Sequence, residues 1–245
     1  MRVNLVHIDG KMPNLALMKL SAYWKRQRAE VGMNGVRGGL NFVSCIFERN
    51  RARAERLAEV LHAELGGIGI GNSKVLPREI EHIMPDYSLY GIEYSMGYTS
   101  RGCVRDCPWC IVPQFEGPIK DHAEVRVFWN PNSCRIILMD NNFFAAPSWR
   151  DRVKELDELP VEVNFYQGND IRLIGEEQAY WLTKLKVRNS SFNTDQMHFS
   201  FDFLGLEAVI RQGVKTLSDA GVKPRRLMIH ILTGYDTTFE QDYER

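Results

Sequence analysis

The feature that most constrains the fold is a regular alternation of short apolar runs and longer amphipathic segments. In the second part of the chain, the apolar runs that predict strands lie at 92–99, 135–140, 161–167, 197–203 and 226–232. Helical periodicity between them predicts helices at 147–159, 175–187 and 206–220. Connections that contain a helix are long enough to join parallel strands. This part of the chain is therefore predicted to be an α/β structure with parallel strands.

The first part of the chain shows the same alternation on a smaller scale. Segments 2–8 and 40–47 predict strands, whereas 13–28 and 50–64 predict helices, with a further short helix at 77–84. Residues 85–91 contain proline and glycine and predict a linker. We therefore expect two domains, at 1–90 and 91–245.

A cysteine-rich segment at 97–113 carries the most distinctive chemistry of the sequence. It places Cys103, Cys107 and Cys110 in a C-x3-C-x2-C spacing, directly after the candidate strand at 92–99. Gly102 precedes the first cysteine and Pro108 lies in the last gap, and both residues favour a loop. Three thiolates in such a loop can converge on one metal centre.

Zinc and an iron–sulfur cluster are both compatible with three cysteines. Structural zinc normally takes four ligands in two closely spaced pairs, but Cys45 and Cys134 are isolated in the sequence and His122 has no neighbouring ligand. The two isolated cysteines are expected to be buried thiols. A four-iron cluster held by three cysteines keeps one iron without a protein ligand, and an open coordination position is typical of a catalytic centre. The cluster is the favoured interpretation and zinc is the alternative.

Cys103, Cys107 and Cys110, with Trp109 before the last cysteine, resemble the cluster motif of the radical S-adenosylmethionine (SAM) superfamily. The continuation 108–113, followed by Gly117, resembles the branch that contains methylthiotransferases and enzymes with a cobalamin-binding domain. The resemblance implies a [4Fe-4S] cluster, SAM, and an external electron donor. It also implies hydrogen abstraction by a 5′-deoxyadenosyl radical, leading to methylation or methylthiolation of an unknown substrate. No residue is assigned a catalytic role from the sequence.

The same resemblance implies a fold for each domain. Residues 91–245 are expected to form a partial (β/α) barrel, which is truncated or completed by a partner chain. Residues 1–90 are expected to form a small Rossmann-like domain of the cobalamin-binding type, in which Gly66 and Gly67 are similar to the paired glycines of that domain. The domain contains no Asp-x-His-x-x-Gly motif, so cobalamin is possible but not favoured.

Polar residues that follow the candidate strands are expected to contact SAM, because ligands of parallel α/β folds bind at the carboxyl ends of the strands. By the resemblance, Asp140, Asn141 and Asn142 match the position that holds the SAM amino group. After the third strand, the Arg172 guanidinium is suited to the SAM carboxylate, and the amides and carboxylate of Gln167, Asn169 and Asp170 are suited to ribose hydroxyls. Asp202, near the end of the fourth strand, is a further candidate contact. Trp109 is expected beside the adenine. Asx residues after strands are also common turn formers and helix caps. His198 and His230 lie within candidate strands and are expected to be core or structural residues.

Charge and hydropathy limit the partners. Lys plus Arg and Asp plus Glu are 31 each, so no overall basic field attracts nucleic acid, and RNA is neither indicated nor excluded. No apolar run reaches membrane-spanning length, and a reduced set of cysteines suits the cytoplasm. A non-catalytic protein that binds zinc or SAM as a regulator or scaffold is the alternative to an enzyme.

Overall fold

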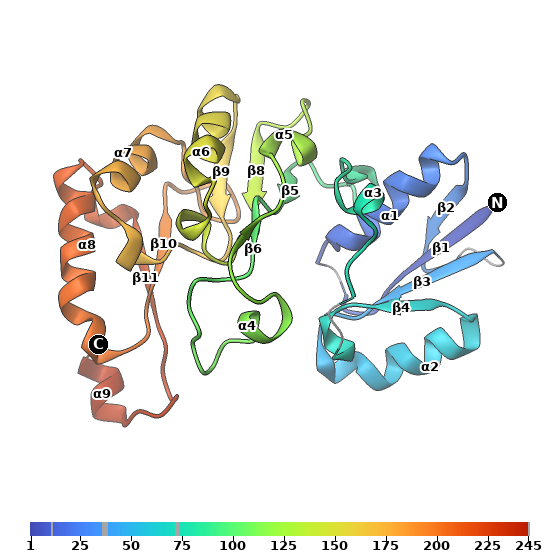
Figure 1. Cartoon of the computed structure of the whole chain (residues 1–245), viewed down its shortest axis with the longest axis horizontal. Helices are drawn as coiled ribbons and strands as arrows, with labels where there is room; N and C mark the ends of the chain where they lie inside the picture. Colours follow the sequence, from blue (N-terminus) through green and yellow to red (C-terminus); the bar gives the residue numbers. More distant parts are fainter. Residues whose placement is uncertain (11, 36–38, 72–73, 245) are drawn as a thin grey trace. The chain divides into compact units, whose positions relative to one another are not determined.

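The computed structural model describes residues 1–10, 12–35, 39–71 and 74–244 and divides into two compact units (Figure 1). The first unit is Met1–Glu93 and the second is Tyr94–Arg245, against an expected boundary near residue 90. Both units combine helices with sheets of parallel strands, as the sequence predicts. In the described part of the chain, none of the helices has the length and apolar character needed to span a membrane.

The first unit contains a four-stranded parallel sheet in the order β2-β1-β3-β4. The strands are β1 (Arg2–His7), β2 (Glu30–Met33), β3 (Leu40–Ser44) and β4 (Glu64–Gly66). The helices are α1 (Leu15–Arg26), α2 (Arg51–Leu61) and α3 (Arg78–Glu81). Predicted strands β1 and β3 and all three predicted helices are confirmed, whereas the sequence reading did not identify β2 and β4.

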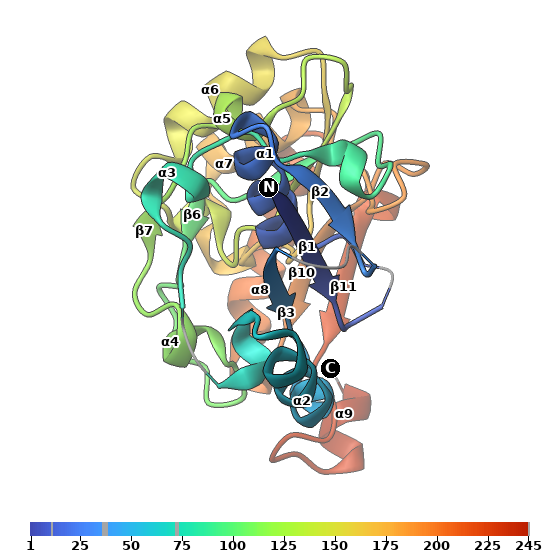
Figure 2. The same ribbon diagram turned by 90° about the vertical axis from the view of Figure 1, so that its right-hand side faces the viewer.

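Helices cover both faces of this sheet (Figure 2). Side chains alternate between the two faces of a strand. Val3 and Leu5 of β1 therefore pack in one apolar cluster with α1, and Val6 and Ile8 pack in another with α2. Cys45, directly after β3, is fully buried in the second cluster, as expected. Val3, Leu5 and Val6 of β1 are buried because both faces of the strand are covered, and the polar Asn4 and His7 are buried with them.

The second unit contains parallel strands in the expected chain order. Strands β5 (Ser95–Gly97), β8 (Arg135–Leu138) and β9 (Glu162–Phe165) form one parallel sheet. Strands β10 (Met197–Phe201) and β11 (Leu227–Ile231) form a parallel pair. An isolated parallel bridge between Asn169 and Phe199 links the loop after β9 to β10. The five predicted strands of this unit are therefore confirmed.

Three longer helices pack against these strands through a large apolar cluster. They are α6 (Trp149–Glu158), α7 (Glu176–Lys184) and α8 (Glu207–Asp219), and shorter helices are α5 (Val125–Phe128) and α9 (Phe239–Glu244). Leu156 of α6, Leu182 of α7 and Leu217 of α8 are at most 1% exposed in this cluster. Cys134, just before β8, is exposed, so its expected burial is wrong. It lies in the turn that precedes β8, where its side chain remains outside the core.

Candidate metal and cofactor site

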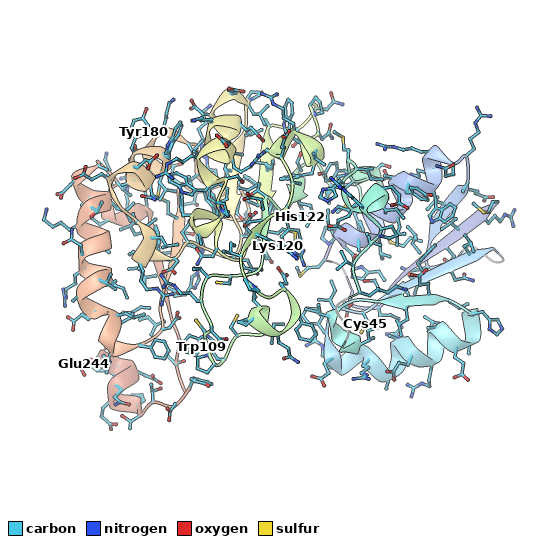
Figure 3. The ribbon with its side chains drawn as sticks, viewed as in Figure 1. Cys45, Trp109, Lys120, His122, Tyr180 and Glu244 are labelled. Atoms are coloured by element: carbon cyan, nitrogen blue, oxygen red, sulfur yellow. The ribbon has the colours of Figure 1, made fainter. Side chains whose placement is uncertain are left out.

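The three cysteines lie in a loop closed by a short antiparallel ladder at the carboxyl end of β5. The ladder pairs β6 (Ser100–Arg101) with β7 (Lys120–Asp121), and the Cys103 backbone N–H donates to Gly117 O over 3.2 Å. Helix α4 (Val112–Phe115) follows the third cysteine. Figure 3 labels Trp109 in this loop, and Lys120 and His122 where the chain returns. We call residues 102–118 the cysteine loop.

Gly102 is required by the way this loop closes. Its φ is +80°, a conformation that residues with a side chain rarely adopt. A Cβ on Gly102 would lie 2.3 Å from the carbonyl oxygen of Pro118. The two ends of the cysteine loop can therefore approach each other only with glycine at this position.

All three cysteines line one cavity of about 350 Å³. The other walls come from residues after β8 and β9 and from the ends of β10 and β11. Of the residues predicted to bind SAM, those that line this cavity are Trp109, Asn141, Asn142, Gln167, Asn169, Asp170, Arg172 and Asp202. The structure therefore gathers cysteines and polar side chains that are up to about a hundred residues apart in the sequence.

Backbone and side-chain donors approach two of the sulfur atoms. The Arg105 and Val112 backbone N–H groups donate to Cys103 Sγ and Cys110 Sγ, each over 3.4 Å. The Asn142 amide donates to Cys103 Sγ over 3.8 Å. Hydrogen bonds to cysteine sulfur stabilise thiolates and tune iron–sulfur clusters.

The three thiols surround the cavity and do not meet at one point. Among the described residues, no three His, Cys, Asp or Glu side chains form a group that could hold a metal ion. Burial raises the pKa of the Cys107 thiol, Arg172 opposes the shift, and Cys110, Asp202 and Cys103 add to it. Cys107 and the four residues that act on its pKa all line the same cavity. The donor set, three thiols beside backbone N–H groups, is chemically suited to an iron–sulfur cluster.

Asp140, in contrast, does not line the cavity. Asp140 is 3% exposed, and its carboxylate accepts hydrogen bonds from the backbone N–H and hydroxyl groups of both Thr99 and Ser100, over 2.6 to 3.1 Å. Burial raises the pKa of Asp140, and the four donors act in the opposite direction. The residue connects the end of β8 to the start of the cysteine loop, and the structure does not bring it to the position expected for a SAM contact.

Asp170 is the charged centre of the cavity wall. Its oxygens accept from Arg105 Nε at 2.9 Å and from Arg172 Nε at 2.6 Å, and its side chain is 6% exposed. Burial raises the pKa of Asp170, but the hydrogen bonds and positive charges of Arg172 and Arg105 outweigh it and hold that pKa below its usual value. Arg172 is therefore already paired with a carboxylate, in place of the free guanidinium that the sequence suggested.

Two asparagines of the cavity have buried polar atoms without a partner. Asn142 Oδ1 and both polar atoms of the Asn169 amide are buried and form no hydrogen bond within the protein. Such atoms are uncommon, and each costs about 1–3 kcal/mol when it stays unpaired. Because both residues line the cavity, a ligand with polar groups is the natural partner for them. Asn169 is one of the candidate contacts after the third strand, but the sequence did not distinguish this residue from an ordinary turn former.

Glu116 is a further residue of the site that sequence reasoning missed. Its carboxylate accepts from the Gly102 backbone N–H at 2.9 Å and from the Asn141 amide at 2.8 Å, and it pairs with Arg101 at 2.8 Å. It joins both ends of the cysteine loop to the segment after β8. An isolated glutamate in a loop gives no sequence signal for such a role.

The rim of the cavity is aromatic. Trp109 contacts the ring of Phe203 with centroids 4.6 Å apart and the ring of Tyr235 with centroids 5.3 Å apart. These rings come from the cysteine loop and from the segments after β10 and β11, so they connect three parts of the wall. Trp109 lines the cavity, and two neighbouring rings already cover part of it. Its place beside the adenine stays a prediction.

Comparison with known proteins gives no family for this chain. No protein-family model matches it, and no curated protein matches its sequence. The argument for function therefore depends on the residues and geometry of the site.

Proposed function

We propose that the second unit is a radical SAM enzyme, in which Cys103, Cys107 and Cys110 hold a [4Fe-4S] cluster and SAM binds beside it. One observation carries the proposal: three cysteines line the same cavity as the unpaired Asn142 Oδ1 and the unpaired Asn169 amide. Cysteines alone suit several metals, and unpaired polar atoms alone suit several ligands. Together they fit a metal centre with a polar organic molecule next to it.

The proposed fold is a partial (β/α) barrel. The observations in its favour are five parallel strands, helices packed on them, and a cavity at the carboxyl ends of the strands, where such folds bind their ligands. The proposed fold of the first unit is a small Rossmann-like domain of the cobalamin-binding type. Its strand order, β2-β1-β3-β4, and its helices on both faces favour this proposal.

A reduced cluster would supply the electron that cleaves SAM and gives a 5′-deoxyadenosyl radical. The protein residues have separate tasks. Glu116 and Asp140 fix the cysteine loop, so the three sulfur atoms are held around the cavity. Asn142 Oδ1 can accept hydrogen bonds from the amino acid or ribose groups of SAM, and the Asn169 amide can both donate to and accept from them. The buried Asp170 holds Arg105 and Arg172 at the wall, where their remaining N–H groups can reach the SAM carboxylate.

The alternative is a non-catalytic protein in which zinc or SAM binding has a regulatory or scaffold role. The two proposals differ in the metal and in turnover. A zinc protein would contain zinc without sulfide and would release no 5′-deoxyadenosine. A SAM-binding regulator would bind SAM without cleaving it.

The test is anaerobic reconstitution of the chain with iron and sulfide, followed by incubation with SAM and a strong reductant. We expect about four irons per chain, as a [4Fe-4S] cluster requires, and release of 5′-deoxyadenosine without added substrate. A variant with Cys103, Cys107 and Cys110 replaced by alanine should lose both. The matched control is Cys134→Ala, which removes an exposed cysteine outside the cavity and should change neither. Equal 5′-deoxyadenosine release by the triple variant and the parent would refute the proposal.

A further inference from the structure

A histidine pair lies on the polar face of strands β10 and β11. Along β10 the residues Met197, Phe199 and Phe201 are buried, whereas His198 and Ser200 between them are half-buried. The parallel register pairs Ser200 with His230 of β11. Ser200 and His230 both line the cavity that contains the cysteines. His230 is exposed, so of the two expected roles, core or structural, the core role is wrong.

Hydrogen bonds fix the protons of this pair. His198 Nε2 lies 3.1 Å from Gln196 Oε1, and His198 Nδ1 lies 2.9 Å from His230 Nε2. An amide oxygen can only accept, so His198 Nε2 carries a proton. The Nδ1 atom of a neutral His198 is then an acceptor, and His230 Nε2 is the donor to it. This leaves Nδ1 of a neutral His230 with a lone pair and no proton.

The arrangement favours a neutral His198. Burial lowers the pKa of His198, and the nearby His230 lowers it further. When His230 takes up a proton at Nδ1, its Nε2–H still donates to His198, and the chain of hydrogen bonds to Gln196 is unchanged. Protonation therefore requires no rearrangement of the pair. Proteins set the tautomer of a reactive histidine by giving one ring N–H a fixed hydrogen-bond acceptor, which leaves the other ring nitrogen free to react.

We propose that His230 is the proton acceptor of this cavity and that His198 and Gln196 are its positioning residues. In the proposed step, an O–H or N–H bond of the bound molecule breaks and an Nδ1–H bond of His230 forms. The electron pair stays on the oxygen or nitrogen of the bound molecule, and the positive charge is shared between His230 and its hydrogen bond to His198. The substrate class is therefore a molecule with a hydroxyl or amino group near its reacting carbon. The inference rests on the proposed function.

Other charged and titratable groups line the same cavity. Asp202 directly follows β10, and the three cysteines come from the cysteine loop. Arg105 and Arg172 both pair with Asp170 on the segment after β9. The remaining polar neighbours, Ser200 and Gln196, are neutral.

The test is a titration of the full-length chain labelled with ¹⁵N-histidine, followed by long-range ¹H–¹⁵N spectra between about pH 5 and pH 9. The chain has six histidines, and His230→Gln identifies the signals of His230. We expect His230 to carry its proton on Nε2 at high pH and to gain the second proton at Nδ1 as the pH falls. In His198→Phe the Nε2 preference should be lost and the pKa of His230 should fall, because the acceptor is removed.

Two further variants separate this effect from a general disturbance. Gln196→Leu keeps both imidazoles and should weaken the tautomer preference of His198 and His230 together. His62→Asn, on the exposed end of α2 in the first unit, should leave the His230 signals unchanged. An Nδ1–H tautomer of neutral His230, or an unchanged His230 titration in both His198→Phe and Gln196→Leu, would overturn the inference. The spectra report histidine protonation whether or not SAM is cleaved, so failure of the proposed function gives a different result.

Discussion

The carboxyl ends of the two parallel sheets differ in how their polar groups are paired. In the first unit, Asp9 accepts from the backbone N–H groups of Ile46 and Phe47 and from the Asn50 amide. In the second unit, Asn142 Oδ1 and the whole Asn169 amide stay unpaired beside the cavity. At the end of β1, His7 Nε2 is also buried without a partner, but the cavity of the second unit gathers three such atoms from Asn142 and Asn169. This difference favours the second unit for the proposed chemistry.

The largest effect is expected from a buried acceptor that anchors the cysteine loop. Asp140→Asn replaces one carboxylate oxygen with an amide that opposes the donors of Thr99 and Ser100. We expect a loss of about 3 kcal/mol or more in the free energy of unfolding, because buried donors lose a charged acceptor. The matched change in the first unit, Asp9→Asn, affects a less buried carboxylate and should cost about 1–2 kcal/mol.

Urea denaturation measures both losses, and hydrogen exchange followed by mass spectrometry assigns each loss to its unit. Faster exchange in 94–121 is expected for Asp140→Asn only. A larger loss for Asp9→Asn than for Asp140→Asn would contradict the proposed anchoring role.

The next effect concerns the closure of the cysteine loop. Gly102→Ala combines a positive φ with a clash against Pro118, so we expect a loss of about 2–3 kcal/mol in the free energy of unfolding. Gly117→Ala is the control, since Gly117 has a φ of +69° but nothing within 4 Å of an added Cβ, and should cost about 1 kcal/mol. Equal losses in urea denaturation would show that the close approach of the two chain segments does not constrain position 102.

A third prediction compares a paired and an unpaired asparagine. Asn169→Leu removes a buried amide without partners and should leave stability unchanged or raise it by about 1 kcal/mol, while SAM binding is lost. In the first unit, Asn14 caps α1 through Leu17 N at 3.1 Å and donates to Ser44 at 2.7 Å. Asn14→Leu should therefore cost about 1–2 kcal/mol. Thermal unfolding and calorimetric SAM titration measure the two properties, and destabilisation by Asn169→Leu would show that its amide already has a partner.

The smallest effect is a pH dependence. The pKa of Asp170 is lower in the folded chain than in the unfolded chain, where a value of about 3.9 applies. Its contribution to stability is therefore complete above that value and is lost as the pH falls through the folded pKa. In Asp170→Asn, the free energy of unfolding of the second unit should fall less steeply as the pH is lowered.

In the first unit the pKa of Asp86 is also lowered, because hydrogen bonds from Lys25, Ser21 and Ser88 outweigh the effect of burial. Asp86→Asn should make the loss of stability at low pH less steep in the first unit alone. Unfolding measured between about pH 2 and pH 6 with hydrogen exchange resolves the two units. If the loss of stability at low pH is the same in Asp170→Asn as in the parent, the ion pairs with Arg105 and Arg172 do not contribute to stability.

The sequence predicted elements whose pattern is local. The burial of β10 alternates along the strand, a pattern that can be read from its sequence. Helix α1 has an apolar stripe and ends in basic residues, which can also be read along the chain. It did not predict β2 and β4. β2 follows α1 closely and begins with Glu30, and β4 has three residues and ends in glycine. Both strands exist because β1 and β3 offer edges for pairing, which is a property of the assembled sheet.

The same distinction applies to the site. The cysteine spacing is local, and the sequence identified all three cysteines that line the cavity. The roles of Glu116, Asn169 and the His198–His230 pair depend on contacts between distant segments, such as the register of β10 and β11. Asp140 was assigned to ligand binding because it follows a strand, but its oxygens are taken up by residues about forty positions earlier in the chain.

The most direct test of the central claim is the amount of 5′-deoxyadenosine that the reconstituted, reduced chain releases from SAM under anaerobic conditions. The account predicts measurable release by the parent and by Cys134→Ala, and none by the variant without Cys103, Cys107 and Cys110. A parent chain that binds zinc and releases no 5′-deoxyadenosine would contradict it.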